Sequence, residues 1–88
     1  MPIVADMRKQ EANGHLRKAI GPAIREIRQR TGISVSQLAV SVGCTQGYMS
    51  NVELGHKQPT VEFLARVARQ LGCSLDAISY VPETVVAA

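Results

Sequence analysis

The chain has 88 residues, 45% of them apolar, and a formal net charge of +3. This length predicts one domain near the lower end of sizes that fold without disulfides or metals. With no Trp, one Phe and two Tyr, the core must be aliphatic, which favours packed helices. No apolar run approaches the roughly 20 residues that cross a bilayer, and the N-terminus lacks the apolar stretch of a signal peptide. We therefore expect a cytoplasmic protein that does not contact membranes.

Positive charge is concentrated in the first third of the chain. Residues 1–33 hold seven basic and three acidic residues, whereas the remainder holds three basic and four acidic ones. A basic region suits contact with an anionic partner such as nucleic acid. Mildly basic small proteins are common, so the charge alone does not assign a function.

Residues 1–18 show no regular apolar period and include the turn-prone pair Asn13-Gly14. We expect a basic, flexible N-terminal arm. Two interpretations stay open. The arm is a tail without a role, or it reaches phosphates or a minor groove of DNA through its basic side chains, which are Arg8, Lys9, Arg17 and Lys18.

A first helix is expected from about Lys18 or Gly21 to Arg30. Its apolar positions recur at helical spacing, at Ile20, Ala23, Ile24 and Ile27. Pro22 is tolerated only in a first turn, where its missing N–H would have no intrahelical partner. Gly32 ends the helix.

Two short helices joined by a tight turn follow, at about 35–42 and 46–54. The first has one apolar face at i, i+3, i+4 and i+7, formed by Val35, Leu38, Ala39 and Val42. Ser34 stands before this face as an N-cap. Gly43 stands after it, where a left-handed residue often ends a helix. Thr45 is the N-cap of the second helix.

The second of these helices has an unusual outward face. Met49 and Val52 point inward, and the opposite positions are Gln46, Gly47, Ser50, Asn51 and Leu54. Most solvated helix faces carry Lys and Glu, whereas this one is nearly free of charge. Because a side-chain amide donates and accepts in one plane, the face suits hydrogen bonding to base edges.

The rest of the chain predicts two further helices and a tail. A polar loop, 56–59, leads to a helix from the cap Thr60 to about Leu71. Ser74 caps a short fifth helix through Ser79. Residues 80–88 could add a strand, form a dimer contact or fray, and the sequence leaves these alternatives open.

The sequence offers little for an enzyme or a metal site. Cys44 and Cys73 lack metal-ligand spacing and are expected to be buried small hydrophobes, although a redox pair stays open. His15 and His56 lie in the arm and a loop, and there is no nucleophile–base pair or Gly-rich phosphate loop. We expect no enzyme activity, no metal and no cofactor.

The segment from Ser34 to Gly55 resembles the helix-turn-helix of the phage-repressor and Cro-like (XRE) family of bacterial DNA-binding proteins. The matching residues are Leu38, Ala39, Gly43, Thr45, Met49, Ser50, Val52, Glu53 and Gly55. The resemblance covers roughly residues 20–79, through Ile24, Arg28, Gly32, Pro59, Leu64, Ala68, Leu71, Gly72, Leu75 and Ile78. It implies an all-α, five-helix lambda-repressor-like domain over residues 19–79, with the helix at 46–54 in the major groove.

The resemblance places the base-reading positions on the second helix of the motif, at Gln46, Gly47, Ser50 and Asn51, with Tyr48 beside them. Gln46 and Asn51 suit bidentate contact with adenine. Gly47 is a departure, because many relatives carry a reading side chain there. It either allows closer approach to the bases or leaves one base pair unread.

Phosphate contacts are expected where hydroxyls and free N–H groups begin a helix or follow one. These positions are Ser34, Val35, Ser36, Thr45, His56, Lys57 and Gln58, with Arg17 and Lys18 from the arm. Val35 stands where relatives commonly carry Gln, so its contact would use the backbone N–H. The resemblance also pairs Glu53 with Arg28 as a structural ion pair.

The implied function is sequence-specific binding of double-stranded DNA by a transcriptional regulator. The resemblance implies a homodimer on a pseudo-palindromic operator, with a dimer surface around Leu75, Ile78, Tyr80 and Val81. An antitoxin-type protein, which binds its own operator and a partner toxin, is the alternative.

Overall fold

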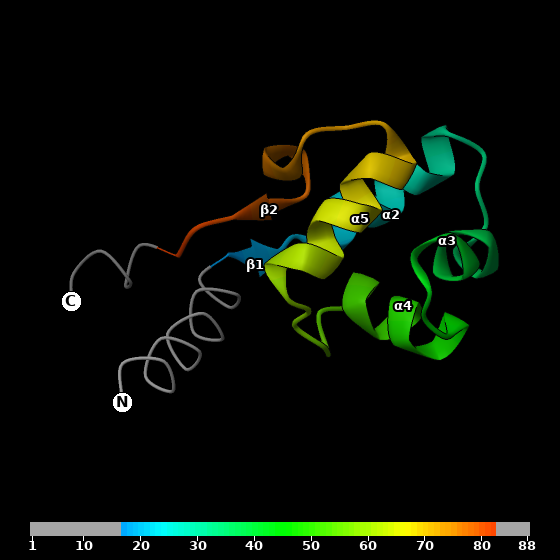
Figure 1. Ribbon diagram of the computed structural model, residues 1–88, viewed down its shortest axis with the longest axis horizontal. Coiled ribbons are helices and arrows are strands. Elements are labelled where there is room, and N and C mark those ends of the chain that lie inside the picture. Colours follow the sequence, from blue (N-terminus) through cyan, green and yellow to red (C-terminus); the bar gives the residue numbers. More distant parts are fainter. Residues whose placement is uncertain (1–16, 83–88) are drawn as a thin grey trace, which may run out of the picture.

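The computed structural model describes residues 17–82, so Arg8, Lys9 and residues 83–88 lie outside the described part. The elements in chain order are β1 (Lys18–Ala19), α2 (Gly21–Arg30), α3 (Val35–Val42), α4 (Gln46–Glu53), α5 (Val61–Leu71), the 3-10 helix η1 (Leu75–Ala77) and β2 (Ser79–Tyr80). The four α-helices pack together, and the small sheet lies at the side where both ends of the described chain leave (Figure 1). The mainly helical fold class is as expected.

Capping residues set the bounds of the three central helices. The side chains of Ser34, Thr45 and Thr60 each accept a hydrogen bond from a backbone N–H three residues on, at the starts of α3, α4 and α5. α3 and α5 end at Gly43 and Gly72, both left-handed. Local sequence therefore determines where these helices begin and end.

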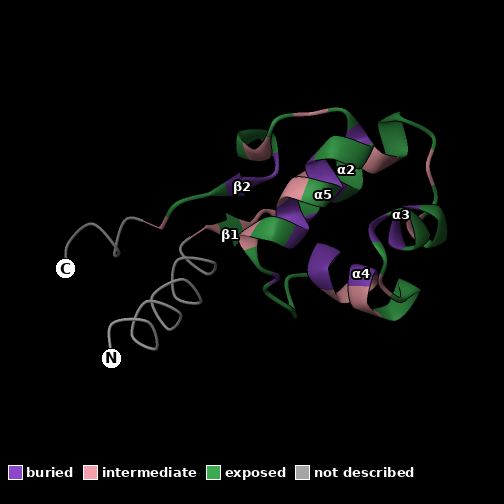
Figure 2. Cartoon of the chain, in the orientation of Figure 1, coloured by how far each residue is buried: buried purple, intermediate pink, exposed green. Residues whose placement is uncertain are grey.

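The inner faces of the helices form a core that is aliphatic except for Phe63, and Figure 2 shows the buried positions in purple. Its buried members come from every α-helix and include one residue after η1: Ile24, Leu38, Ala39, Val42, Met49, Val52, Phe63, Leu64, Val67, Ala68, Leu71 and Ile78. α4 packs against both α3 and α2. The recognition-helix candidate is therefore held from two sides.

The end of the fold differs from the expected fifth α-helix. Only Leu75–Ala77 are helical, as a 3-10 turn capped by Ser74. The chain then extends, and Ser79 and Tyr80 pair antiparallel with Ala19 and Lys18. Because these backbone groups bond to β1, they cannot continue the intrahelical pattern.

Ile78 is fully buried. It therefore cannot belong to a dimer surface, which corrects that part of the expectation. Tyr80 and Val81 are about half exposed and remain available.

The two-stranded sheet decides between the two expected starts of the first helix. α2 begins at Gly21, not at Lys18, because Lys18 and Ala19 are extended in β1. The N–H of Ile20 donates to the carbonyl of Ile78 at 2.8 Å. Arg17 and Lys18 therefore belong to the folded part described here and not to an arm.

Candidate nucleic-acid interface

α3, the turn at 43–45 and α4 form a helix-turn-helix. Two first turns of this unit are joined directly. The Ser36 hydroxyl, at the start of α3, donates to Oε1 of Gln46, at the start of α4, at 2.6 Å. Ser36 therefore orients the first candidate reading side chain. This bond uses only Oε1 of Gln46, so the two N–H donors on Nε2 stay available to a ligand.

The outward face of α4 is polar, uncharged and partly covered. Gln46 and Gly47 are exposed, whereas Ser50 and Asn51 are half-buried. Leu54, the C-cap of α4, is 62% exposed. The face therefore offers amides and a hydroxyl along most of its length and one apolar side chain at its end.

Tyr48 packs against α5, a contact that the sequence did not reveal. Its ring meets the Phe63 ring edge-on, with centroids 5.4 Å apart. The Arg66 guanidinium lies over the Phe63 ring, 5.7 Å from its centroid. The aromatic contact holds the Tyr48 ring toward α5, so only its hydroxyl end is suited to a polar ligand.

Gly47 is not required by the folded chain itself. A Cβ at this position would meet no atom within 4 Å, and Gly47 is not among the glycines with positive φ. Glycine costs helix stability relative to alanine. The side of α4 that Gly47 leaves bare therefore faces open space.

Arg28 and Glu53 form a nearly buried ion pair between α2 and α4. Nε of Arg28 lies 2.7 Å from Oε2 of Glu53, and Nη2 lies 3.1 Å from Oε1. Nη1 donates to the carbonyl of Ile33 at 2.9 Å. Only 11% of the Arg28 side chain and 6% of the Glu53 side chain is exposed. The bidentate geometry neutralises the one acid on α4.

Gly21 is a positioning residue that the sequence analysis missed. A Cβ at Gly21 would overlap the main-chain carbonyls of Glu53 and Val52. The start of α2 therefore lies directly on the end of α4. In the sequence, the only signal of this role is a glycine at the start of a predicted helix, and such a glycine is not specific for close helix packing.

The candidate phosphate contacts at the helix starts retain free donors. Ser34 forms a capping box with Gln37, through its side chain and its backbone N–H. The N–H groups of Val35 and Ser36 have no acceptor among the hydrogen bonds of the described residues. The Thr45 hydroxyl caps α4 by accepting a hydrogen bond from the N–H of Tyr48. Free N–H groups at a helix start suit an anion.

The loop after α4 is tied back to the helix. The N–H groups of His56 and Lys57 both donate to the carbonyl of Asn51, at 2.8 and 3.2 Å. Both side chains are exposed. These two side chains therefore extend into solvent from a fixed backbone.

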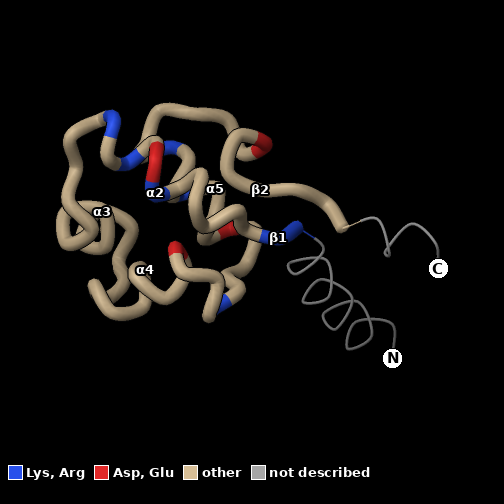
Figure 3. Tube along the Cα trace, turned by 180° about the vertical axis from the view of Figure 1, so that it is seen from behind, with Lys and Arg blue, Asp and Glu red and all other residues tan. Residues whose placement is uncertain are grey.

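Gln58 and Arg17 are engaged within the protein. Oε1 of Gln58 accepts from the N–H of Ala19 at 2.6 Å. Nη1 of Arg17 lies 2.7 Å from Oδ1 of Asp76 and 3.2 Å from the Ser79 hydroxyl. Because β1 brings these groups together, both side chains hold the sheet in the free protein. Lys18 is exposed on β1. Figure 3 shows basic positions in blue beside this strand.

Cys44 and Cys73 are free thiols and half-buried. Burial raises the pKa of both, and the nearby charge of Arg66 partly offsets this for the pKa of Cys44. Residues 17–82 contain no cluster of His, Cys, Asp or Glu that could hold a metal ion. No helix in this range is long and apolar enough to span a bilayer.

Comparison with known proteins places this geometry in a family. The family described as Helix-turn-helix matches residues 24–78. SlrR of Bacillus subtilis (strain 168), a helix-turn-helix-type transcriptional regulator, is 44% identical over 57 residues. The match covers 64% of this chain and 38% of SlrR, so the chain spans well under two thirds of that relative.

Solved structures show the same fold. SinR in complex with DNA is 33% identical with a TM-score of 0.61, covering 65% of this chain and 92% of that one. The P22 c2 repressor in complex with a synthetic operator is 29% identical with a TM-score of 0.62, covering 66% and 88%. SinR in complex with the SinI protein is 33% identical with a TM-score of 0.60, covering 64% and 55%. The chain belongs to the phage-repressor and Cro-like helix-turn-helix family.

Proposed function

We propose that this protein is a transcriptional regulator that binds double-stranded DNA sequence-specifically and inserts α4 into the major groove. The observation that carries the proposal is the outward face of α4, which presents the exposed amide of Gln46 and the half-buried polar groups of Ser50 and Asn51, without a charged side chain. Such a face has little use in solvent, whereas it matches the donors and acceptors of base edges. The DNA-bound structures of SinR and the P22 c2 repressor support the same use of the shared fold.

Base reading falls to the exposed end and the centre of α4. Gln46 and Asn51 are the candidates for bidentate contact with adenine, and Ser50 and the hydroxyl of Tyr48 supply further polar atoms. Gly47 lets the helix approach the bases closely. The bond between Ser36 and Gln46 supports this assignment, because it orients the Gln46 amide before DNA arrives.

Phosphate binding falls to the helix starts and the loop after α4. The N–H groups of Val35 and Ser36 and the side chains of Ser34, Thr45, His56 and Lys57 are the candidates. Gln58 and Arg17 contribute a smaller share, since both side chains already bond within the fold. Lys18 is a further candidate on β1. These contacts fix the position of α4 without reading sequence.

We further propose a homodimer on a pseudo-palindromic site. One helix of eight residues reads only a few base pairs, and two-fold symmetry doubles the contacts. Tyr80 and Val81, each about half exposed, and the half-buried Leu75 are the candidate dimer surface. The two half-sites would be about 34 Å apart, one turn of DNA.

An antitoxin-type protein is the alternative, which binds its own operator through the same domain and a partner toxin through its tails. The structure of SinR with SinI supports protein contacts by a relative. A small protein that co-purifies with this chain in a fixed ratio favours the alternative. A homodimer alone on DNA favours the regulator.

Selection of bound duplexes from a random pool tests the function. We expect an enriched pseudo-palindrome whose half-sites contain adenines that Gln46 and Asn51 contact. The control is the double variant Gln46→Ala with Asn51→Ala, which should bind the pool without enriching the same sequence. Failure of the wild-type protein to enrich any sequence would reject the proposal.

A further inference from the structure

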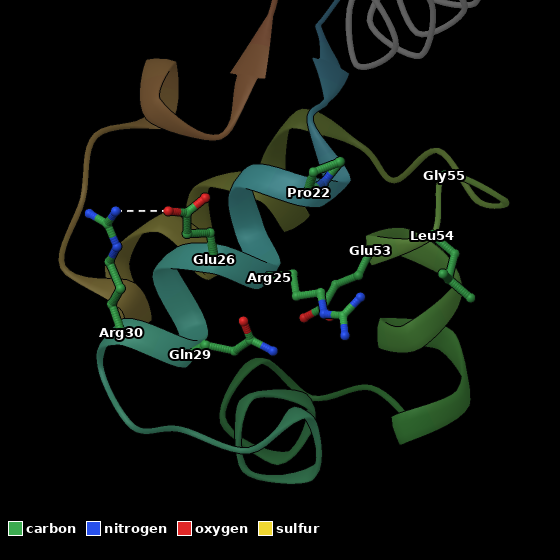
Figure 4. A pocket seen from close by; sticks show the side chains of 8 residues that line it. All are labelled: Pro22, Arg25, Glu26, Gln29, Arg30, Glu53, Leu54 and Gly55. Atoms are coloured by element: carbon green, nitrogen blue, oxygen red, sulfur yellow. Dashed lines mark hydrogen bonds and ion pairs between the residues drawn. The ribbon is translucent and has the colours of Figure 1, made fainter.

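A groove runs between α2 and the end of α4, and Arg25 lies in it. One part, of about 220 Å³, is lined by Arg25, Arg28, Val35, Ser50, Glu53 and Leu54. A second part, of about 700 Å³, shares Arg25, Glu53 and Leu54 and continues along α2. Figure 4 shows the Arg25 side chain extending from α2 toward Glu53, with Leu54 beyond it.

One positive charge in this groove, that of Arg25, is not neutralised by an acidic side chain among the described residues. Glu53 is already neutralised by two hydrogen bonds from Arg28. Arg30, on the same helix, pairs with Glu26. Arg25 takes part in none of the ion pairs among the described residues and is exposed. A positive side chain beside a neutral pair favours an anion in the groove.

The groove opens beside the proposed DNA-binding face. Ser50, on the outward face of α4, lines one wall, and Val35, the first residue of α3, lines another. The N–H groups of Val35 and Ser36 have no acceptor among the described residues. A guanidinium and a helix start therefore border one recess, and both are suited to a phosphate oxygen.

We propose that Arg25 is a DNA-contacting residue and that the groove between α2 and α4 binds one backbone phosphate of the operator. The proposal rests on the proposed function and adds a phosphate contact outside the helix-turn-helix. The exposed Leu54 forms an apolar wall of the groove, which reduces the water around the contact. The contact positions the protein and reads no base.

The first test measures affinity against salt concentration for a selected and a scrambled duplex. Arg25→Gln should weaken binding to both duplexes roughly tenfold, the order expected for one charge-assisted hydrogen bond, and reduce the salt slope by about one unit. Arg25→Lys should keep most of the slope. The control is Arg69→Gln on α5, which removes the same charge from an exposed residue outside both parts of the groove.

The second test locates the phosphate. Methylphosphonates, which lack the negative charge, replace the linkages of the selected duplex one at a time. One replacement should weaken the wild-type protein and leave Arg25→Gln unchanged, because that variant has already lost the contact. A set of replacements that weakens both proteins equally would overturn the proposal.

The outcomes separate this proposal from the proposed function. A wild-type protein that selects no duplex rejects both. A wild-type protein that selects a duplex, with Arg25→Gln matching its affinity and salt slope, overturns only the role of Arg25. A lower melting temperature of Arg25→Gln without DNA, with an unchanged salt slope, would assign Arg25 a structural role beside Glu53 and also overturn it.

Discussion

The two ends of α4 are held very differently. At the C-terminal end, Val52 and Glu53 are buried, Arg28 grips the carboxylate with two hydrogen bonds, and Gly21 lies against the main chain. At the N-terminal end, the Gln46 side chain is exposed and bonds, among the described residues, only to the Ser36 side chain. The helix is positioned from its buried end, and its other end is left open for a ligand.

This difference predicts which property each end controls. Substitutions at the buried end should lower stability in the absence of DNA, because they remove contacts within the fold. Substitutions at the open end should change binding and leave the fold intact.

Glu53→Ala should have the largest effect. It leaves the Arg28 guanidinium nearly buried without its partner, which costs about 3 kcal/mol. For a domain of this size that corresponds to a drop in melting temperature of roughly 12–24 °C, measured by circular dichroism without DNA.

The matched control is Glu26→Ala, which removes an acid from an exposed ion pair with Arg30. Because exposed pairs contribute little, its melting temperature should stay close to that of the wild type. Equal melting temperatures for Glu53→Ala and the wild type would show that the buried end does not hold α4.

Gly21→Ala should destabilise the protein by roughly 2 kcal/mol, because the new Cβ overlaps the carbonyls of Glu53 and Val52 and pushes the helices apart. Chemical unfolding measures this change. Operator affinity should fall further than stability alone explains, since α4 also shifts. A variant with wild-type stability would mean that α2 moves without cost and does not position α4.

Asn51→Ala tests the central part of the outward face. Loss of its amide should cost roughly 1–3 kcal/mol of binding to the selected duplex and relax preference at one base position. Affinity for a scrambled duplex and the melting temperature should barely change. If both duplexes lose affinity equally, α4 is not the reading element.

Gly47→Ala is the counterpart of Gly21→Ala. Here the Cβ meets open space, so the free protein should gain up to about 1 kcal/mol of stability. If close approach to the bases matters, affinity for the selected duplex should decrease at the same time. Higher stability with unchanged affinity would instead identify Gly47 as facing an unread base pair.

Lys57→Ala should have the smallest effect. Its exposed ammonium can reach only the backbone of DNA, so all duplexes should weaken alike and the salt slope should fall by about one unit. Titration at several salt concentrations measures this. A loss confined to the selected duplex would contradict a phosphate contact.

The sequence predicted the elements whose signals are local. Ser34, Thr45 and Thr60 begin helices and Gly43 and Gly72 end them, as capping chemistry requires. α3 occupies the expected residues, and α4 ends one residue earlier than expected, at Glu53. The Arg28–Glu53 pair is also present, where the family resemblance placed it.

Features that depend on distant contacts could not be predicted. Strands of two residues, such as Lys18–Ala19 and Ser79–Tyr80, are too short to show an alternating pattern. The contact of Tyr48 with Phe63 and the bond from Ala19 to Gln58 join segments whose relative position only the fold determines. For the same reason the sequence does not distinguish Arg25 from the other basic residues, because only the fold brings it beside the end of α4.

The antiparallel pairing of β1 with β2 has a mechanical consequence. Lys18 faces Tyr80 and Ala19 faces Ser79, so the chain enters and leaves the domain at one end of the same short ladder. A force that pulls residues 17 and 81 apart separates the Lys18–Tyr80 pair first and the Ala19–Ser79 pair second. The helices around α4 bear that load only after both pairs have separated. The domain can therefore be tethered through both of its ends with little strain reaching the proposed DNA-binding face.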